Sequence, residues 1–320
     1  MKRTLFVASN RLGDAVLTTG VLHHLLELEP EVPITVVCGE IPKDIFEAVP
    51  GVERVIAVKK RRYSMHWPEV AIDLGFVYWH RIVDFRSCLL GFLPAKQRSI
   101  WKGGNNSLHK VIANANLIGL DGPLPAKIIP TEFQISESRK WLEEAAAQGK
   151  ILAIAPTANF YQKQWHYENY IALAKALTKD GGILNGAKIV VLGAPGEEDQ
   201  ALPVVNAFDD SQVINLIGKT TPMQAATILS QCTLFVGNDS GLMHTATAVN
   251  IPTVGLFGIG MPKVYGPWGE RSLCLTSTPS GVPITRENTE DDVIESLPVE
   301  TVIRETEAFY RRLSRNLSDI

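Results

Sequence analysis

Apolar positions along the chain follow two alternating patterns. Short β-rich apolar runs alternate with longer segments in which apolar residues recur at the spacing of one helix face. In the first half, the runs that predict strands cover residues 4–9, 34–38, 52–58 and 71–76. Helical spacing covers residues 15–28 and 42–48. This alternation predicts a parallel sheet with covering helices. From residue 79 to residue 130 the pattern is less regular, and we expect helices there between loops.

The same alternation begins again after Gly149. Predicted strands cover residues 151–156, 188–193, 213–217, 233–237 and 252–257, and the last of these closes the series. Predicted helices cover residues 167–178, 196–208, 222–230 and 242–249, followed by a helical tail over 290–313. We therefore predict an α/β chain of two domains, residues 1–148 and 149–320. The last helix is a candidate for packing back on the first domain.

Length and fold class together indicate where a ligand would bind. A chain of 320 residues agrees with two domains. Open α/β sheets bind ligands at the carboxyl ends of their strands. With two such sheets, we expect the site in the cleft between them.

The formal net charge of −3 hides an asymmetry. Residues 1–150 carry 19 Lys and Arg against 16 Asp and Glu, whereas residues 151–320 carry 12 against 18. Within residues 54–110, 11 basic residues stand against 3 acidic ones. This local excess points to an anionic partner, which is a nucleic acid, a phospholipid surface or a phosphorylated sugar. The composition, 45% hydrophobic and 20% charged, excludes a disordered or fibrous chain.

Several features predict a cytoplasmic protein without a metal site. The cysteines lie far apart and form no CxxC pair, as expected for reduced, buried thiols. They are Cys38, Cys88, Cys232 and Cys274. The seven histidines form no HExxH motif. The N-terminal apolar run is followed at once by Arg11 and Asp14, which does not predict a signal peptide. No apolar run reaches the ~18–20 residues that span a bilayer.

Asp14 lies in the turn after the first predicted strand, at the edge where a parallel sheet meets its ligand. The turn holds one glycine, Gly13, so it is neither a dinucleotide-binding glycine motif nor a P-loop. Two interpretations of Asp14 stay open. It is a first-turn acid that complements the helix dipole, or it is a general base within about 3 Å of a substrate hydroxyl.

Residues 237–244, GNDSGLMH, join a predicted buried strand to a helix. Backbone N–H groups at the start of that helix would bind an anion such as a pyrophosphate. Gly237 and Gly241 allow a close backbone approach. The segment is not a GxSxG nucleophile elbow, because Asn238 takes the place of the first glycine. The alternative is an ordinary turn capped by Asp239 or Ser240.

Three further loops carry charged candidates at predicted strand ends. Lys163 lies in the long loop after the first strand of the second half, where it would neutralise a phosphate or act as a surface lysine. Glu197 would accept hydrogen bonds from ribose hydroxyls or complement a helix dipole. The basic run at residues 59–62 would bind an anion or form a solvated loop.

Taken together and in this order, these motifs resemble glycosyltransferase family 9, the ADP-heptose:lipopolysaccharide heptosyltransferases. The matching segments are residues 12–17 (LGDAVL), 163–165 (KQW), 193–197 (GAPGE), 237–244 (GNDSGLMH), 257–258 (FG), Pro262 and 266–267 (GP). The resemblance implies a GT-B architecture, with two Rossmann-like domains whose parallel sheets face a central cleft. It also implies that the second domain binds an ADP-sugar, the first binds the acceptor, and transfer inverts the anomeric carbon without a metal.

The resemblance implies a role for each candidate residue. Asp14 would be the general base, and Lys163 would hold the donor diphosphate and stabilise the leaving group. Glu197 would contact the ribose and Asp239 the sugar hydroxyls. The pyrophosphate would contact Ser240 and Gly241, with Leu242 and His244 beside them. The acceptor side would comprise Gly13, Lys59, Lys60, Arg61 and Arg62. Residues 220–224 depart from the family pattern near the expected adenine pocket, and residues 79–130 show little match.

The sequence therefore predicts transfer of a heptose from ADP-heptose to an anionic lipopolysaccharide inner-core acceptor of the Kdo-lipid A type. We expect no cofactor, because the ADP-sugar is a co-substrate, and no nucleic-acid partner, because the second half is acidic. The enzyme would be cytoplasmic or peripheral on the inner face of the inner membrane. Four arginines of the tail are candidates for that contact, or form a solvated helix face: Arg304, Arg311, Arg312 and Arg315. The alternatives are a transferase for another nucleotide sugar or acceptor, and a two-lobed sugar-binding protein without catalysis.

Overall fold

The computed structural model describes residues 2–59, 61–103, 107–144, 149–258, 260–277, 294 and 297–318. Its contacts divide the chain into two compact units. Unit 1 comprises Met1–Ile129 with Thr221–Met223, and unit 2 comprises Pro130–Thr220 and Gln224–Ile320. The division falls after Ile129 and not after residue 148, because the helix that follows packs through Leu142 into the core of unit 2.

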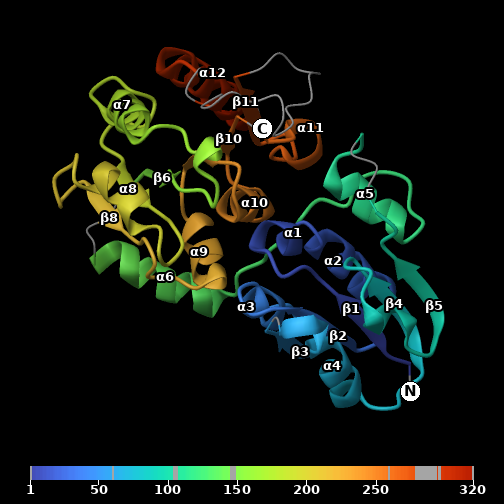
Figure 1. Cartoon of the computed structure of the whole chain (residues 1–320). Coiled ribbons are helices and arrows are strands. Elements are labelled where there is room, and N and C mark those ends of the chain that lie inside the picture. The colour runs from blue at the N-terminus through green and yellow to red at the C-terminus, as the bar shows by residue number, and fades with distance from the viewer. Residues whose placement is uncertain are drawn as a thin grey trace. The chain divides into compact units, whose positions relative to one another are not determined.

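Unit 1 holds a five-stranded parallel sheet in the order β3-β2-β1-β4-β5 (Figure 1). Its strands are β1 (Thr4–Val7), β2 (Ile34–Gly39), β3 (Val52–Val58), β4 (Trp79–Asp84) and β5 (Ala95–Ile100). Its helices are α1 (Leu12–Val16), α2 (Thr19–Leu28), α3 (Lys43–Glu47), α4 (His66–Leu74) and α5 (Lys110–Leu117). Two 3₁₀ turns, η1 (Arg62–Ser64) and η2 (Leu89–Phe92), complete the unit.

Alternating side chains of β1 build a core on each face of this sheet. Phe6 and Ala8 pack with residues of α1, α2 and α3. Leu5 and Val7 pack on the other face with residues of α4 and η2. All four side chains are fully buried, as expected of a central parallel strand that is covered on both faces.

The structure corrects three predictions in unit 1. The predicted helix over 15–28 is two helices, because the hydroxyls of Thr18 and Thr19 donate to the carbonyls of Ala15 and Val16 at the break. The predicted strand over 71–76 is the end of α4 and the turn after it. Residues 79–130 contain the strands β4 and β5 in addition to helices. The edge strand β5 lacked an apolar signature, since its centre is exposed.

Unit 2 holds a six-stranded parallel sheet in the order β11-β10-β9-β6-β7-β8. Its strands are β6 (Ile151–Ala155), β7 (Lys188–Val191), β8 (Val213–Asn215), β9 (Leu234–Asn238), β10 (Thr253–Phe257) and β11 (Ser272–Thr276). Its helices are α6 (Glu132–Glu144), α7 (Tyr167–Thr178), α8 (Glu198–Val205), α9 (Pro222–Leu229), α10 (Gly241–Ala248), α11 (Pro262–Tyr265) and α12 (Val299–Ser318), with a 3₁₀ turn η3 (Tyr161–Lys163).

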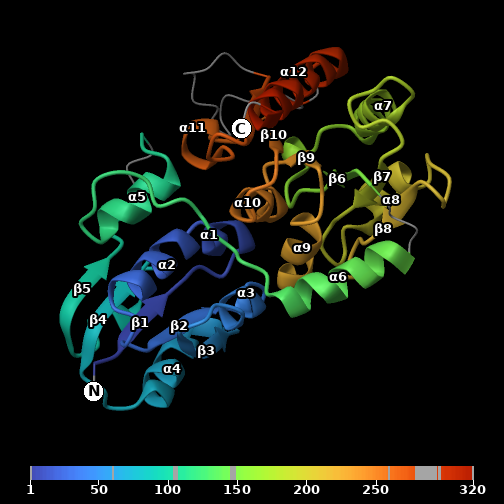
Figure 2. The same cartoon turned by 180° about the vertical axis from the view of Figure 1, so that it is seen from behind.

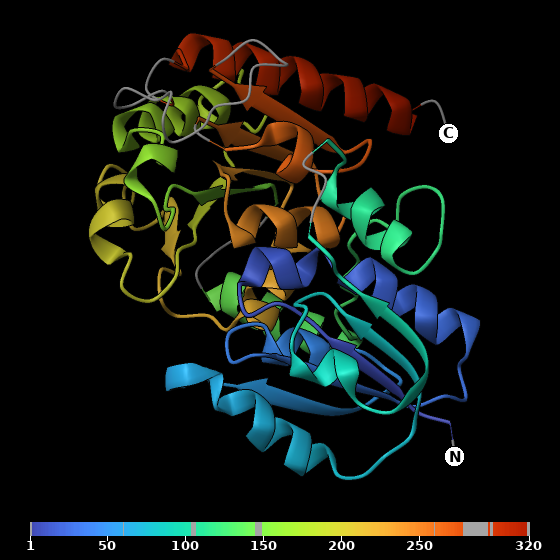
Figure 3. The same ribbon diagram turned by 45° about the vertical axis from the view of Figure 1, so that its right-hand side comes forward.

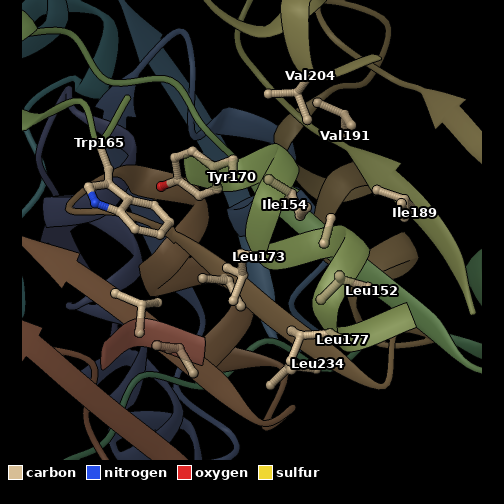
Figure 4. Close-up of a cluster of buried hydrophobic side chains, with 14 of the residues drawn as sticks. Leu152, Ile154, Trp165, Tyr170, Leu173, Leu177, Ile189, Val191, Val204 and Leu234 are labelled. Atoms are coloured by element: carbon tan, nitrogen blue, oxygen red, sulfur yellow. The ribbon is translucent and has the colours of Figure 1, made fainter. Parts of the chain in front are cut away.

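Two cores cover the faces of the second sheet. On one face, side chains of β6, β7 and β9 pack against α7, α8 and α12, with Trp165 and Tyr170 in edge-to-face contact (Figure 4). On the other face, α6, α9 and α10 pack against the strands, and α6 and α9 lie side by side (Figure 2). The long helix α12 lies against α7 and β11 within unit 2 (Figure 3).

The second sheet has one strand more than predicted. The series does not close at residue 257, because β11 adds an edge strand beside β10. All residues of β11 are only partly buried, so its sequence lacks the apolar run that marked the central strands. The predicted tail helix is observed from Val299, directly after Pro298. Its predicted start at 290–293 lies outside the described residues. No helix within the described ranges is both long and apolar enough to span a membrane.

Candidate functional site

The turn that carries Asp14 lies at the carboxyl edge of the sheet in unit 1. Val7 ends β1 and is paired with Val37 of β2 and Asp84 of β4, so the turn emerges between two neighbouring strand ends. The end of β2 lies very close to this turn. A Cβ on Gly39 would lie 2.6 Å from the Cα of Asn10, which only glycine avoids.

Asp14 itself lies in the first turn of α1 and is half-buried. Among the described residues, no side chain caps this helix, so its first-turn N–H groups have no capping partner beside Asp14. The first-turn interpretation is thus compatible with a role as base. Gly13 lies directly before Asp14 in the same turn and is partly buried.

The predicted acceptor-binding basic run follows β3 on the same edge. Because β2 lies between β3 and β1, the ends of β3 and β1 are separated by about 10 Å. Lys59 is exposed. Arg61 forms an exposed ion pair with Glu69 at 2.7 Å, and the guanidinium of Arg62 lies 4.8 Å from the ring centroid of Tyr63. The fourth member, Lys60, lies outside the described residues.

In unit 2, Lys163 and Asp239 form an ion pair at the carboxyl edge of the second sheet. Lys163 ends η3 in the loop after β6, and Asp239 follows β9, the strand next to β6. Their side chains are 22% and 10% exposed, so water reaches the pair only in part. The sequence predicted a diphosphate partner for Lys163 and sugar hydroxyls for Asp239, and the structure brings the two residues together.

Asn238 positions both loops of this pair and was missed as a site residue. Its buried Oδ1 accepts hydrogen bonds from the backbone N–H of Trp165 (3.1 Å) and the hydroxyl of Tyr170 (2.7 Å). Its Nδ2 donates to the carbonyl of Pro156 at 2.8 Å. These bonds tie the loop that carries Lys163 to the end of β9. The signal available in the sequence was a polar residue at the end of an apolar strand, since a buried polar group needs hydrogen-bond partners.

The N-terminus of α10 lies directly after Asp239. Ser240 is its N-cap residue, but its side chain makes no capping bond, and its buried Oγ has no hydrogen-bond partner in the described structure. Gly241 opens the first turn, so its N–H and those that follow are available to an anion. Leu242 packs partly into the core, and His244 is buried. The structure therefore groups Ser240 and Gly241 with Asp239, whereas Leu242 faces the core.

Glu197 is held in the turn after β7. One carboxylate oxygen accepts a hydrogen bond from the backbone N–H of Ala194 at 2.9 Å. The helix that follows this turn is linked to the Lys163 loop, because Gln164 Nε2 donates to Oε1 of Gln200 in α8 at 2.8 Å. The loops after β6, β7 and β9 thus meet at one edge, with the second Glu197 oxygen able to accept a further bond.

The described residues also bear on the prediction that the protein has no metal site. Among the described residues, no three His, Cys, Asp or Glu side chains are placed to hold a metal ion. Independence from a metal stays a prediction.

Known proteins resemble this chain in sequence and in fold. The sequence model of glycosyltransferase family 9 (heptosyltransferase) matches residues 97–293. Lipooligosaccharide heptosyltransferase 2 of Haemophilus ducreyi is 30% identical over 318 residues, covering 88% of this chain and 90% of that protein. A family 9 glycosyltransferase from Veillonella parvula has a TM-score of 0.81 at 21% identity, covering 97% of each chain.

The fold also matches Escherichia coli ADP-heptose lipopolysaccharide heptosyltransferase II, with a TM-score of 0.75 at 20% identity. That likeness covers 98% of this chain and all of the other. Two parallel α/β units and these neighbours confirm the predicted GT-B fold class. The chain therefore belongs to glycosyltransferase family 9, the heptosyltransferases, and is a glycosyltransferase.

Proposed function

We propose that the protein transfers a heptose from ADP-heptose to an acidic inner-core acceptor of lipopolysaccharide, with inversion at the anomeric carbon. The observation that carries this proposal is the Lys163–Asp239 pair beside the start of α10, where the Ser240 hydroxyl has no hydrogen-bond partner among the described residues. A cation, a hydroxyl and helix N–H groups together suit a diphosphate. The likeness to the Escherichia coli ADP-heptose lipopolysaccharide heptosyltransferase II supports the choice of donor.

The proposed reaction is a single displacement. The Asp14 carboxylate takes the proton of the acceptor hydroxyl, and the oxygen attacks the anomeric carbon of the donor. The bond from that carbon to the β-phosphate oxygen breaks, and ADP leaves with the electron pair. Lys163 releases Asp239, binds the diphosphate and stabilises its developing charge, as does the N-terminus of α10. Asp239 is then able to accept hydrogen bonds from the sugar hydroxyls.

Separate variants test the base and the donor site. We expect Asp14→Asn to lower turnover, measured as ADP release, by roughly 10²–10⁴-fold while ADP affinity is unchanged. Lys163→Met should weaken ADP binding by roughly 10–100-fold. Asp73→Asn and Lys179→Met, at exposed positions elsewhere in the same units, are the matched controls. Full turnover in Asp14→Asn would remove the base from the mechanism, and sugar binding without transfer would favour the non-catalytic alternative.

Turnover measurements also test the metal dependence and the choice of donor nucleotide. Turnover retained in excess EDTA would support catalysis without a metal, whereas recovery by one added divalent cation would contradict it. Competition among ADP-, UDP- and GDP-sugars decides the donor. A preference for a nucleotide other than ADP would favour the related transferase over the heptosyltransferase.

We also propose that the protein works in the cytoplasm, with unit 1 in contact with an anionic membrane surface. The segment 54–110, with its excess of basic residues, also exposes Ile72, Phe76 and Tyr78. Apolar and basic side chains together favour an anionic lipid interface. Ion pairs occur on both surfaces, since Arg61 pairs with Glu69 in unit 1 and Arg311 pairs with Glu307 on α12. The exposed apolar side chains are therefore the reason for choosing unit 1.

Flotation with anionic liposomes tests this contact. We expect binding at low salt, with less binding at high salt and in Phe76→Glu. Leu28→Glu, at an exposed apolar position of α2, is the control and should float like the unchanged protein. Absence of flotation at either salt concentration would contradict the proposal.

A further inference from the structure

Helix α5 brings Lys110 near enough to Asp14 for the charge of the carboxylate to act on the ammonium. Lys110 and Asn114 lie one turn apart on one face of α5. Nδ2 of Asn114 donates a buried hydrogen bond of 2.8 Å to the carbonyl of Leu17, which ends α1. Asp14 lies three residues before Leu17, in the first turn of α1. The Asn114 bond therefore holds α5 against the end of α1, and the negative charge of Asp14 acts on Lys110.

The indole ring of Trp101 packs against the ammonium of Lys110. The Lys110 Nζ lies 4.1 Å from the ring centroid, in a cation–π contact. Trp101 follows β5, and its backbone is held on both sides. The backbone N–H of Trp101 donates to the carbonyl of Asp84 at 2.8 Å, and the backbone carbonyl of Trp101 accepts from the hydroxyl of Ser87. The half-buried Lys110 therefore rests its ammonium on the ring of a residue whose backbone is held by the sheet.

The Asp84 carboxylate secures the loop that holds Trp101. It is fully buried at the end of β4 and accepts hydrogen bonds from the backbone N–H groups of Arg86 (2.7 Å) and Cys88 (2.8 Å). These bonds place Ser87, which reaches the carbonyl of Trp101. A continuous set of contacts therefore runs from β4 through Trp101 to Lys110.

Placing a lysine here has an electrostatic cost. Burial lowers the pKa of Lys110, and the nearby charge of Asp14 partly opposes that effect. A lysine on the solvent side of α5 would avoid this cost. An ammonium group carries three N–H donors, which lets it interact with Asp14 and a ligand oxygen together.

We propose that Lys110, supported by Trp101, binds an oxyanion of the acceptor beside Asp14. This inference rests on the proposed function, because it needs Asp14 on the acceptor side. The oxyanion is a carboxylate or a phosphate carried by the acceptor sugar. The sequence placed Lys110 only within the basic segment and predicted that residues 59–62 bind the acidic acceptor, although these follow β3, two strands from the β1 end that carries Asp14.

Steady-state kinetics with charged and neutralised acceptors test the proposal. In Lys110→Met, we expect the acceptor KM to rise by roughly 10–100-fold, with little change in kcat or in the donor KM. Lys110→Arg should restore most of the affinity, because it keeps the cation. Lys102→Met, which changes an exposed lysine after β5, should leave the acceptor KM as in the unchanged protein. Acceptors with the carboxylate amidated or the phosphate removed identify the group, since its loss should abolish the difference between Lys110→Met and the unchanged protein.

Equilibrium binding of the acceptor separates this inference from the function on which it rests. Weaker acceptor binding in Lys110→Met, with an unchanged melting temperature, supports the inference even without turnover. The inference is overturned if Lys110→Met and the unchanged protein bind the acceptor equally well. It is also overturned if Lys110→Met binds every neutralised acceptor as much more weakly than the unchanged protein as it binds the charged one. A fall in kcat alone also overturns it, because Lys110 would then act on the base. Absence of ADP release from the unchanged protein with any ADP-sugar overturns the proposed function instead.

Discussion

The ion pair of Lys163 and Asp239 joins residues 76 positions apart in the chain. Each residue could be selected from its motif, because a charged side chain after a buried strand lies at a ligand-binding edge. Their pairing could not be predicted, because it depends on β6 and β9 being neighbours in the sheet. The same limit applies to Lys110, whose position depends on the Asn114 contact with α1. Local sequence thus identified the groups, and the strand order brought them together.

Asn238 offers a test of this organisation at a single residue. Asn238→Ala would leave the Tyr170 hydroxyl, the Pro156 carbonyl and the Trp165 N–H without their buried partner. We expect the unfolding free energy of unit 2 to fall by about 2–4 kcal/mol, measured by urea denaturation. Tyr170→Phe removes one of the three bonds and should cost about 1 kcal/mol. An equal loss of unfolding free energy in the two variants would show that the bonds of Asn238 to Trp165 and Pro156 add no stability.

Segment 71–76 shows why a short apolar run is ambiguous at the scale of an element. Read with a period of two, its apolar residues predict a strand. The structure uses the helical period instead, because Val70 and Leu74 are buried one turn apart and Ile72 lies on the opposite side of α4. The strands β1, β2 and β3 were predicted, whereas β4, β5 and β11 were not. The edge strands β5 and β11 lack the continuous apolar run that burial on both faces requires, and in the central strand β4 the polar residues His80 and Arg81 interrupt it.

The helical period of α4 has a measurable consequence. In a strand, Ile72 and Leu74 would share one face, but in α4 Ile72 is 80% exposed and Leu74 is 7% exposed. We expect Ile72→Lys to change the unfolding free energy of unit 1 by less than about 0.5 kcal/mol. Leu74→Ala should lower it by about 2–4 kcal/mol, because it leaves a cavity under α4. Similar costs for both substitutions would contradict the helical assignment.

Over the whole molecule, the two units have separate sheets and separate cores. The sequence predicted this division from the repeated strand and helix pattern, although it placed α6 in the first domain. The donor candidates Lys163, Glu197, Asp239 and Ser240 all belong to unit 2, and Asp14 belongs to unit 1. A ligand that contacts the donor loops alone should therefore stabilise one unit selectively.

The four cysteines make that selectivity measurable. Cys38 and Cys88 report on unit 1, and Cys232 and Cys274 report on unit 2. Burial raises the pKa of each thiol to about 12, so at pH 8 about one in 10⁴ is a thiolate and the folded protein should resist alkylation. In increasing urea, pulse alkylation should label the two cysteines of each unit at a common midpoint.

ADP at about 100 times its Kd should stabilise unit 2 by about 2.7 kcal/mol and move the midpoint of Cys232 and Cys274 to higher urea. The midpoint of Cys38 and Cys88 should stay in place, because the proposed ADP contacts lie outside unit 1. Lys163→Met should reduce the shift, and Lys179→Met should preserve it. A shift of all four thiols together would mean that ADP stabilises both units, and a shift of Cys38 and Cys88 alone would place the nucleotide on unit 1.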